Sequence, residues 1–120
     1  MKIRKEYCNW DGSRVWEEVV SYVKSHGTFS SVTGIPYSAT FVGSCIFIKG
    51  GKPGTKRSVE GEYLTGKGFI AAYDIIRTFD EINTGKVKPY IRRQQTPFMG
   101  LLFSAGIIEQ DNDIFDRTLI

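Results

Sequence analysis

The most motif-like stretch of the chain is residues 46–58, which read IFIKGGKPGTKRS and place glycines and lysines directly after an apolar run. A phosphate-binding P-loop needs G-x-x-x-x-G-K-[ST] between a buried strand and a helix, so that backbone N–H groups converge on the phosphates. Here the glycine spacing differs, and Arg57 follows Lys56 where the motif requires serine or threonine. Residues 58–61 are also a poor start for a helix. The turn-forming pairs GG and PG instead predict a hairpin loop between two strands.

Four cations would gather around the tip of this hairpin loop. A cluster of this kind can hold the phosphate backbone of a nucleic acid, and it can equally serve only to keep a protein in solution. The sequence leaves both interpretations open. The four cations are Lys49, Lys52, Lys56 and Arg57.

A second basic segment, residues 86–95, carries side chains that are suited to nucleic acids. Arginine can bond to guanine, glutamine to adenine, and lysine and tyrosine to phosphates. Recognition helices present such residues at i, i+3, i+4 spacing, whereas here four of them are consecutive, so a solvated helix end is the competing interpretation. The candidate residues are Lys86, Lys88, Tyr90, Arg92, Arg93, Gln94 and Gln95.

The sequence offers no convincing catalytic or metal-binding constellation. One histidine, His26, and two distant cysteines, Cys8 and Cys45, do not make a plausible four-ligand zinc site. No oxyanion-hole motif accompanies a Cys/His dyad, and the spacing around Glu60 and Glu62 does not fit a nuclease centre. In a reducing compartment both cysteines should be free thiols. We therefore expect no catalytic residue, no metal, no small-molecule cofactor and no enzyme activity.

The composition predicts one folded domain over residues 1–120, because 41% of the residues are apolar, which is enough for one packed core. The net charge of +3 is small but unevenly distributed. Residues 49–93 carry ten basic and five acidic groups, while residues 94–120 carry one basic and four acidic groups. Such asymmetry can steer an anionic partner to the middle of the chain. Residues 109–120 are predicted to be an acidic tail.

The N-terminal sequence MKIRKEYCNWDG is charged from the start and contains no apolar run typical of a signal peptide. No stretch of the chain approaches the roughly 18 apolar residues that a transmembrane helix needs. These observations predict a cytoplasmic protein without a membrane partner.

Residues 13–26 are predicted to form an amphipathic helix, because four valines and a tryptophan recur on one stripe. Asp11 or Ser13 is the expected N-cap, and Gly27 is a suitable left-handed stop. Valine is a mediocre helix former, so packing must supply much of the stability of this helix.

Residues 28–60 change to the pattern of short strands. The runs TFSSV, PYSATFV, SCIFIK and TKRSVE are rich in aromatic and β-branched residues and are separated by turns that contain glycine. Gly43 and Ser44 suit the two central positions of a type II′ hairpin. Residues 45–48 are apolar on both faces and should be the central strand of an antiparallel meander.

The rest of the chain is predicted to be helical. A long amphipathic helix should cover residues 65–79, with Thr65 as its N-cap. A short helix should run from residue 89 to residue 95, and Thr96 followed by Pro97 should begin another. The predicted fold is thus α+β: an N-terminal helix, an antiparallel meander of three or four short strands, then one long and two short helices.

Two classes of function are consistent with these features. The first is a small non-enzymatic nucleic-acid-binding protein, such as an accessory protein of a phage or mobile element, in which the hairpin tip and residues 86–95 grip one phosphate backbone. The alternative is a protein–protein interaction module, such as a small inhibitor or adaptor, with Trp10, Trp16 or the aromatic strands as its contact surface. The first class requires two basic segments, far apart in the sequence, to share one face of the fold.

Overall fold

The computed structural model describes residues 1–111, which form an α+β fold around a four-stranded antiparallel sheet. Each strand pairs with its neighbour in the sequence, so the sheet is the predicted meander with four strands. In order across the sheet, the strands are β2 (Thr28–Ser30), β3 (Pro36–Val42), β4 (Cys45–Gly50) and β5 (Glu62–Thr65).

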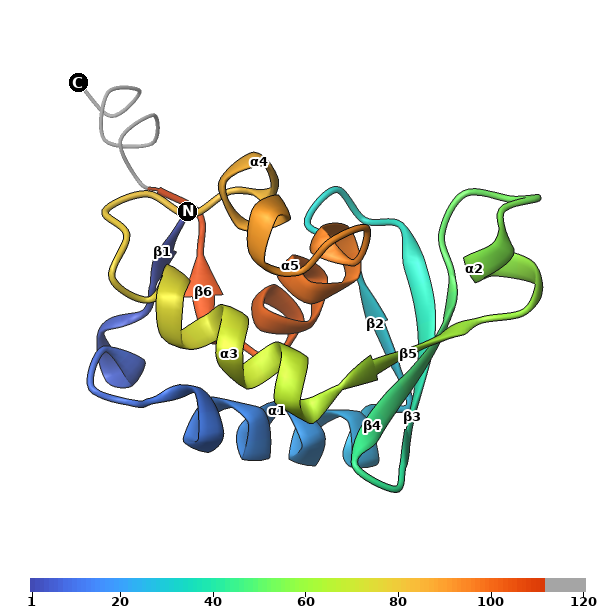
Figure 1. Ribbon diagram of the computed structural model, residues 1–120, viewed down its shortest axis with the longest axis horizontal. Helices are drawn as coiled ribbons and strands as arrows, with labels where there is room; N and C mark the ends of the chain where they lie inside the picture. The colour runs from blue at the N-terminus through green and yellow to red at the C-terminus, as the bar shows by residue number, and fades with distance from the viewer. Residues whose placement is uncertain (112–120) are drawn as a thin grey trace.

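Five α-helices accompany the sheet in the described part of the chain: α1 (Gly12–His26), α2 (Lys56–Val59), α3 (Gly66–Ile76), α4 (Thr84–Val87) and α5 (Gln95–Ser104). In Figure 1, α1, α3 and α5 lie to one side of the sheet, while α2 projects beyond its other side. Two short 3₁₀ turns, η1 (Lys5–Tyr7) and η2 (Lys88–Tyr90), complete the helical segments. Among residues 1–111, no helix is both long and apolar enough to cross a membrane.

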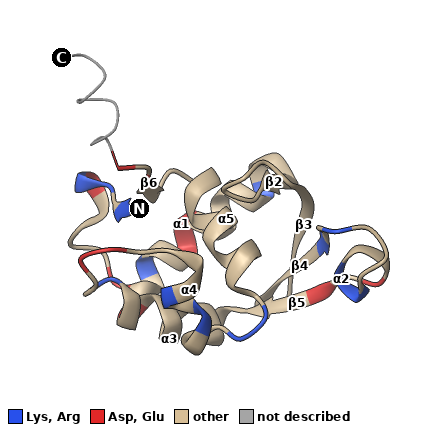
Figure 2. Cartoon of the chain, turned by 90° about the horizontal axis from the view of Figure 1, so that it is seen from above, with Lys and Arg blue, Asp and Glu red and all other residues tan. Residues whose placement is uncertain are grey.

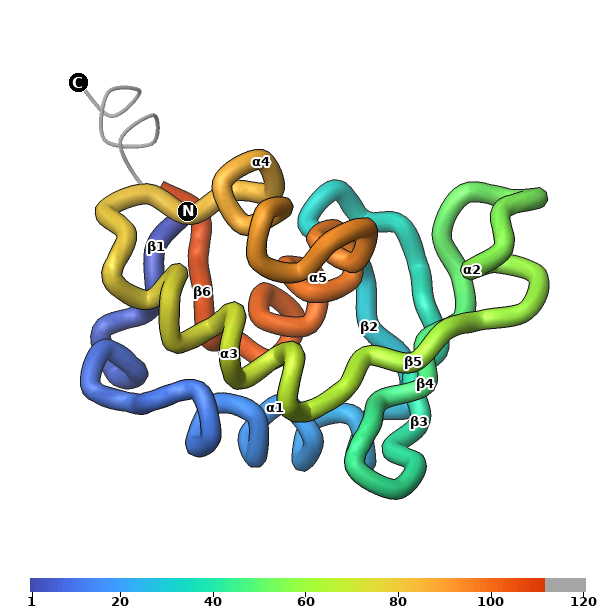
Figure 3. The backbone as a smooth tube through the Cα atoms, in the orientation of Figure 1, coloured from blue at the N-terminus to red at the C-terminus, as the bar shows by residue number. Residues whose placement is uncertain are grey.

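The two ends of the described chain lie side by side in a second, two-stranded sheet, as Figure 3 shows. β1 (Lys2–Ile3) pairs antiparallel with β6 (Ile108–Glu109). The predicted acidic tail, residues 109–120, therefore begins inside a strand. Residues 112–120 of that tail lie outside the described residues.

The two long helices begin where the sequence predicts. The carboxylate of Asp11 accepts a hydrogen bond of 3.0 Å from the backbone N–H of Arg14, and Gly27 ends α1 with a φ of 70°. The hydroxyl of Thr65 caps α3 in the same way, accepting from the N–H of Gly68 at 3.0 Å. α1 buries the predicted stripe of Val15, Val19, Val20 and Val23.

The predicted hairpin between β3 and β4 is confirmed. Val42 and Cys45 are register partners, so Gly43 and Ser44 alone form the turn. Gly43 has a φ of 62° while Ser44 does not have a positive φ, which is the pattern of a type II′ turn. β4 also lies between β3 and β5, in the inner position predicted for it.

The strand predicted over residues 55–60 is wrong, because this segment forms the one-turn helix α2. The Thr55 hydroxyl caps the turn by accepting from the N–H of Ser58, and the Ser58 hydroxyl donates back to the Thr55 carbonyl at 3.0 Å. These local bonds offer the backbone an alternative to pairing in a sheet. Gly61, with a φ of 80°, then reverses the chain into β5, which is the fourth strand.

The short helix predicted over residues 89–95 is also wrong. Helical structure begins earlier, with α4, because the Asn83 side chain accepts from the N–H of Lys86 at 2.9 Å and so caps its start. It ends with η2, and Arg93 adopts a left-handed φ of 60° that no continuous helix tolerates. Thr96 is not the N-cap of the last helix, since α5 begins one residue before it.

Tyr73 on α3 is a fully buried side chain whose hydroxyl has no hydrogen-bond partner among residues 1–111. Burial raises the pKa of Tyr73 from its ordinary value of 10.0 to about 12, outweighing the opposite effect of the nearby Arg77. Between these two pH values the unfolded chain releases the phenol proton and the folded chain keeps it. Stability therefore falls as the pH rises above 10.

We predict that Tyr73→Phe leaves the free energy of unfolding near neutral pH unchanged or raises it by up to about 1 kcal/mol, because the variant removes an unpaired buried hydroxyl. At about pH 11, the wild type should lose about 1.4 kcal/mol more stability than the variant. Urea unfolding of both proteins at about pH 8 and about pH 11 measures the difference. If Tyr73→Phe lowers the free energy of unfolding at neutral pH by more than about 1 kcal/mol, the Tyr73 hydroxyl must have a hydrogen-bond partner, which would contradict the structure.

Candidate nucleic-acid interface

The predicted hairpin tip is the connection between β4 and β5, residues 51–61, and it contains α2. Lys49 near the end of β4, Lys52 in the connection and Lys56 in α2 are all exposed. The two glycines after Lys49 let the backbone turn out of the sheet, since their φ angles are 145° and 91°. Three of the four predicted tip cations are therefore open to solvent.

The fourth tip cation, Arg57, has a structural role. Its guanidinium forms an ion pair with Glu62 on β5, and only 21% of the Arg57 side chain is exposed. The same guanidinium donates a hydrogen bond to the backbone carbonyl of Arg93. Arg57 thus ties α2 to the chain just before α5 and neutralises a nearby carboxylate.

Gln94 ties the same turn before α5 to the strand β5. Its side-chain amide donates a 2.9 Å hydrogen bond to the backbone carbonyl of Tyr63. β5 is an edge strand of the sheet, so no further strand pairs with its open side. The two bonds hold the turn before α5 along the edge of β5, and they leave Arg92 and Arg93 exposed there.

We call the resulting cluster of exposed cations the joined basic surface. In Figure 2, basic segments at α2 and on the turn before α5 lie on either side of an acidic segment at the start of β5. The acidic residue of β5 is Glu62, which Arg57 already pairs. The joined basic surface consists of Lys49, Lys52, Lys56, Arg92 and Arg93.

Three other predicted residues are not part of the joined basic surface. Lys86 belongs to α4, and Lys88 and Tyr90 belong to η2. Figure 2 places α4 over α3 and apart from α2. The Tyr90 ring packs edge-on against Phe79, with 6.0 Å between the ring centroids. These residues are exposed, and they take no part in the hydrogen bonds from Arg57 and Gln94 that fix the turn before α5.

The two glutamines are partly enclosed by the fold. Gln94 already uses its amide on the Tyr63 carbonyl. Gln95 is half-buried, and its side-chain oxygen is buried without a hydrogen-bond partner among residues 1–111. A base-reading role of these two side chains stays a prediction.

An aromatic pair beside the joined basic surface was not identified from the sequence. Phe47 and Tyr63 are register partners on β4 and β5, and their ring centroids are 5.0 Å apart. Their neighbours Ile46 and Leu64 are buried in the core, so the aromatic pair lies on the opposite face of the sheet. Tyr63 is 56% exposed. Tyr63, Leu64 and Thr65 all favour a strand, and this run is the available signal in the sequence; the prediction of a strand over residues 55–60 conflicts with it.

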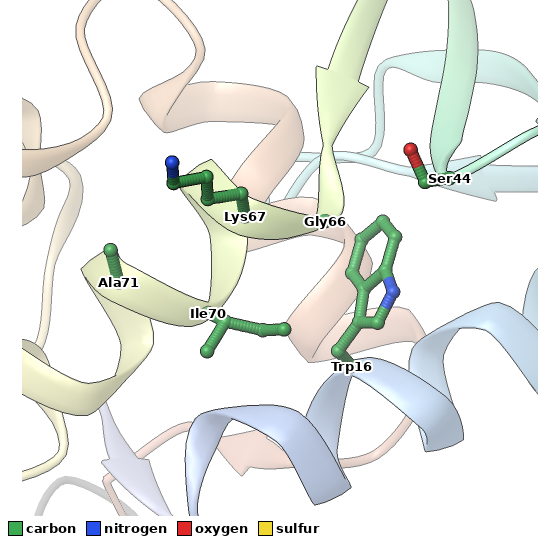
Figure 4. A pocket seen from close by; sticks show the side chains of 6 residues that line it. All are labelled: Trp16, Ser44, Gly66, Lys67, Ile70 and Ala71. Atoms are coloured by element: carbon green, nitrogen blue, oxygen red, sulfur yellow. The ribbon is translucent and has the colours of Figure 1, made fainter.

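A different surface surrounds Trp16, between α1, the start of α3 and the β3–β4 turn (Figure 4). The indole packs so closely over Gly66 that a Cβ there would lie 2.8 Å from Trp16 Cε2. A shallow, mainly apolar hollow of about 550 Å³ opens beside it, with Ile70 and Ala71 on the α3 side. Trp10, in contrast, is covered by its own neighbour Arg14, whose guanidinium carbon lies 3.9 Å from the ring centroid.

The groups considered for catalysis are dispersed. Cys8 is exposed and Cys45 is half-buried, and both are free thiols. His26 makes a 2.9 Å hydrogen bond between Nδ1 and the Tyr22 carbonyl, and its ring stacks on that of Tyr22. Among residues 1–111, no three His, Cys, Asp or Glu side chains gather as metal ligands would.

The geometry of this candidate site is therefore that of a charged, partly aromatic surface built on a sheet edge. Its cations come from two segments, which the hydrogen bond from Arg57 to the Arg93 carbonyl joins, and the bond from Gln94 to the Tyr63 carbonyl fixes the second segment on β5. Comparisons of the chain with protein-family models, curated proteins and solved structures found no significant match.

Proposed function

We propose that this protein is a small nucleic-acid-binding protein without catalytic activity, and that it holds a phosphate backbone on the joined basic surface. Nucleic acids bind largely through phosphate contacts with lysine and arginine, and such contacts need several cations on one face. The sequence alone offered two separate basic segments.

One observation carries the proposal: the hydrogen bond from the Arg57 guanidinium to the Arg93 carbonyl. This bond joins residues 36 positions apart in the sequence and brings Arg92 and Arg93 next to the hairpin tip. The charge balance supports the same conclusion. Within residues 1–111, none of the five cations of the joined basic surface is in an ion pair.

Removing two of these cations tests the proposal. We predict that Arg92→Ala combined with Arg93→Asn lowers the affinity for a nucleic acid roughly 10- to 100-fold at about 0.1 M salt. The slope of log affinity against log salt should also fall by about 2. Asparagine is used at position 93 because it tolerates the left-handed φ of 60° found there. Fluorescence anisotropy over a salt series measures both quantities.

A matched control is Lys86→Ala combined with Lys88→Ala, which removes the same charge away from α2. Its affinity should fall less than that of the arginine double variant. Equal losses in the two variants would mean that net charge, and not the joined basic surface, decides binding. Absence of any binding at about 50 mM salt would exclude the proposed function.

The hollow beside Trp16 favours the alternative, a protein–protein interaction module. Tryptophan is frequent at the energetic centre of interfaces, and here it borders an apolar hollow that also exposes Ala71. Nucleic-acid binding that weakens steeply with salt supports the first proposal, because an apolar contact at this hollow has no steep dependence on salt.

A further inference from the structure

We propose that the nucleic acid taken by the joined basic surface is single-stranded, and that an unpaired base stacks on the ring of Tyr63. This inference rests on the proposed function and names the substrate class of the same site. It also assigns a binding role to a residue outside the set of cations.

The position of Tyr63 supports stacking. The ring lies on the outer face of the edge strand β5 and contributes nothing to the core, since 56% of the residue is exposed. Phe47 supports it from the neighbouring strand, with 5.0 Å between the ring centroids and 57° between the ring planes. Phe47 itself is half-buried, and Gly61 lies directly against its ring. Tyr63 is thus a supported aromatic side chain with open surface.

The cations around Tyr63 are placed to hold phosphates on either side of a stacked base. Lys49 is two residues from Phe47 on β4, so both side chains are on the outer face of the sheet. On the open edge of β5, the bond from Gln94 to the Tyr63 carbonyl fixes the turn that presents Arg92 and Arg93. Cations therefore lie on both sides of β5, on the neighbouring strand β4 and on the turn along its open edge.

An aromatic ring at this position distinguishes single strands from duplexes. In a duplex the faces of the bases are covered by their neighbours, so a side chain on a sheet can reach only phosphates and groove edges. In a single strand the faces are available, and stacking on an aromatic side chain contributes about 1 to 3 kcal/mol per base. Only the single strand uses both the cations and Tyr63.

The test uses three fluorescein-labelled probes of about 15 nucleotides: single-stranded oligo-dT, a duplex, and a strand of abasic sites with the same phosphates. Oligo-dT should bind more tightly than the other two. Tyr63→Ala should lower the affinity for oligo-dT roughly 5- to 150-fold and leave the affinity for the abasic strand within about twofold. Tyr63→Phe, which keeps the ring, should retain the wild-type affinity for oligo-dT. Circular dichroism confirms that each variant is folded.

The outcomes separate this inference from the proposed function. If the arginine double variant weakens binding but Tyr63→Ala does not, base stacking is overturned and the proposed function stands. Equal affinity of the wild type for oligo-dT and duplex, or for oligo-dT and the abasic strand, also overturns the inference. If none of the three probes binds at about 50 mM salt, both proposals fail together.

Discussion

Replacing Phe69 by alanine should lower the free energy of unfolding by about 3 to 5 kcal/mol. Phe69 is 0% exposed and stands where three helices meet. Its ring centroid lies 5.1 Å from that of Trp16 on α1 and 5.0 Å from that of Phe98 on α5. Truncation to alanine removes these contacts and leaves a cavity that rigid helices on both sides cannot close completely.

Urea unfolding of the two proteins, followed by circular dichroism, measures this loss. Ile75→Ala is the matched control, because Ile75 is on the same helix but is 43% exposed, and it should lose less than about 1.5 kcal/mol. If Phe69→Ala does not fold, Phe69→Leu is measured in its place and should lose less. A loss below about 1 kcal/mol for the alanine variant would contradict the central role of Phe69.

The sequence was sufficient for elements whose signals are local. Asp11 and Gly27 mark the ends of α1, and Thr65 marks the start of α3, because caps satisfy backbone groups within a few residues. The Gly43-Ser44 turn was predictable for the same reason. The meander then followed, since strands joined by short turns pair with their neighbours.

The errors arose where two local preferences compete. Residues 55–60 contain β-branched residues typical of a strand, yet hydrogen bonds between Thr55 and Ser58 favour a helical turn. At the start of α5, Thr96-Pro97 is a good capping pair, but the helix already begins one residue earlier. Just before α5, Arg93 has a left-handed φ, and its carbonyl accepts a hydrogen bond from Arg57. The two residues are too far apart in the sequence for a local pattern to indicate this contact.

The cations of the candidate site are visible in the sequence, but neither their arrangement nor the aromatic pair beside them was predicted. Every cation of the joined basic surface was a predicted site residue, because lysine and arginine are recognised from the sequence alone. The sequence could not show that Arg57 pairs with Glu62 and reaches the Arg93 carbonyl, or that Gln94 bonds to Tyr63. Contacts between residues so distant in the sequence follow from the packing of the whole chain.

Gly61→Ala should destabilise the protein by about 2 to 5 kcal/mol and also impair the proposed interface, because Gly61 lies against the ring of Phe47. A Cβ at this position would lie 2.4 Å from Phe47 Cζ and 3.0 Å from the Ile48 carbonyl oxygen. Alanine would also have to adopt a φ of 80°, which costs about 1 to 2 kcal/mol for an L-residue. Overpacking against Phe47 adds about 1 to 3 kcal/mol.

Gly54→Ala, in the same connection, isolates the contribution of the ring. Gly54 has a φ of 82°, almost the same as Gly61, but a Cβ there would meet nothing within 4 Å. Both variants carry the backbone strain, so the difference between their unfolding free energies measures the contact with Phe47. Gly61→Ala should also shift Phe47 under Tyr63 and weaken binding of oligo-dT, whereas Gly54→Ala should not. Equal stability of the two variants would show that Phe47 moves aside freely, and would remove the argument that Tyr63 rests on a fixed support.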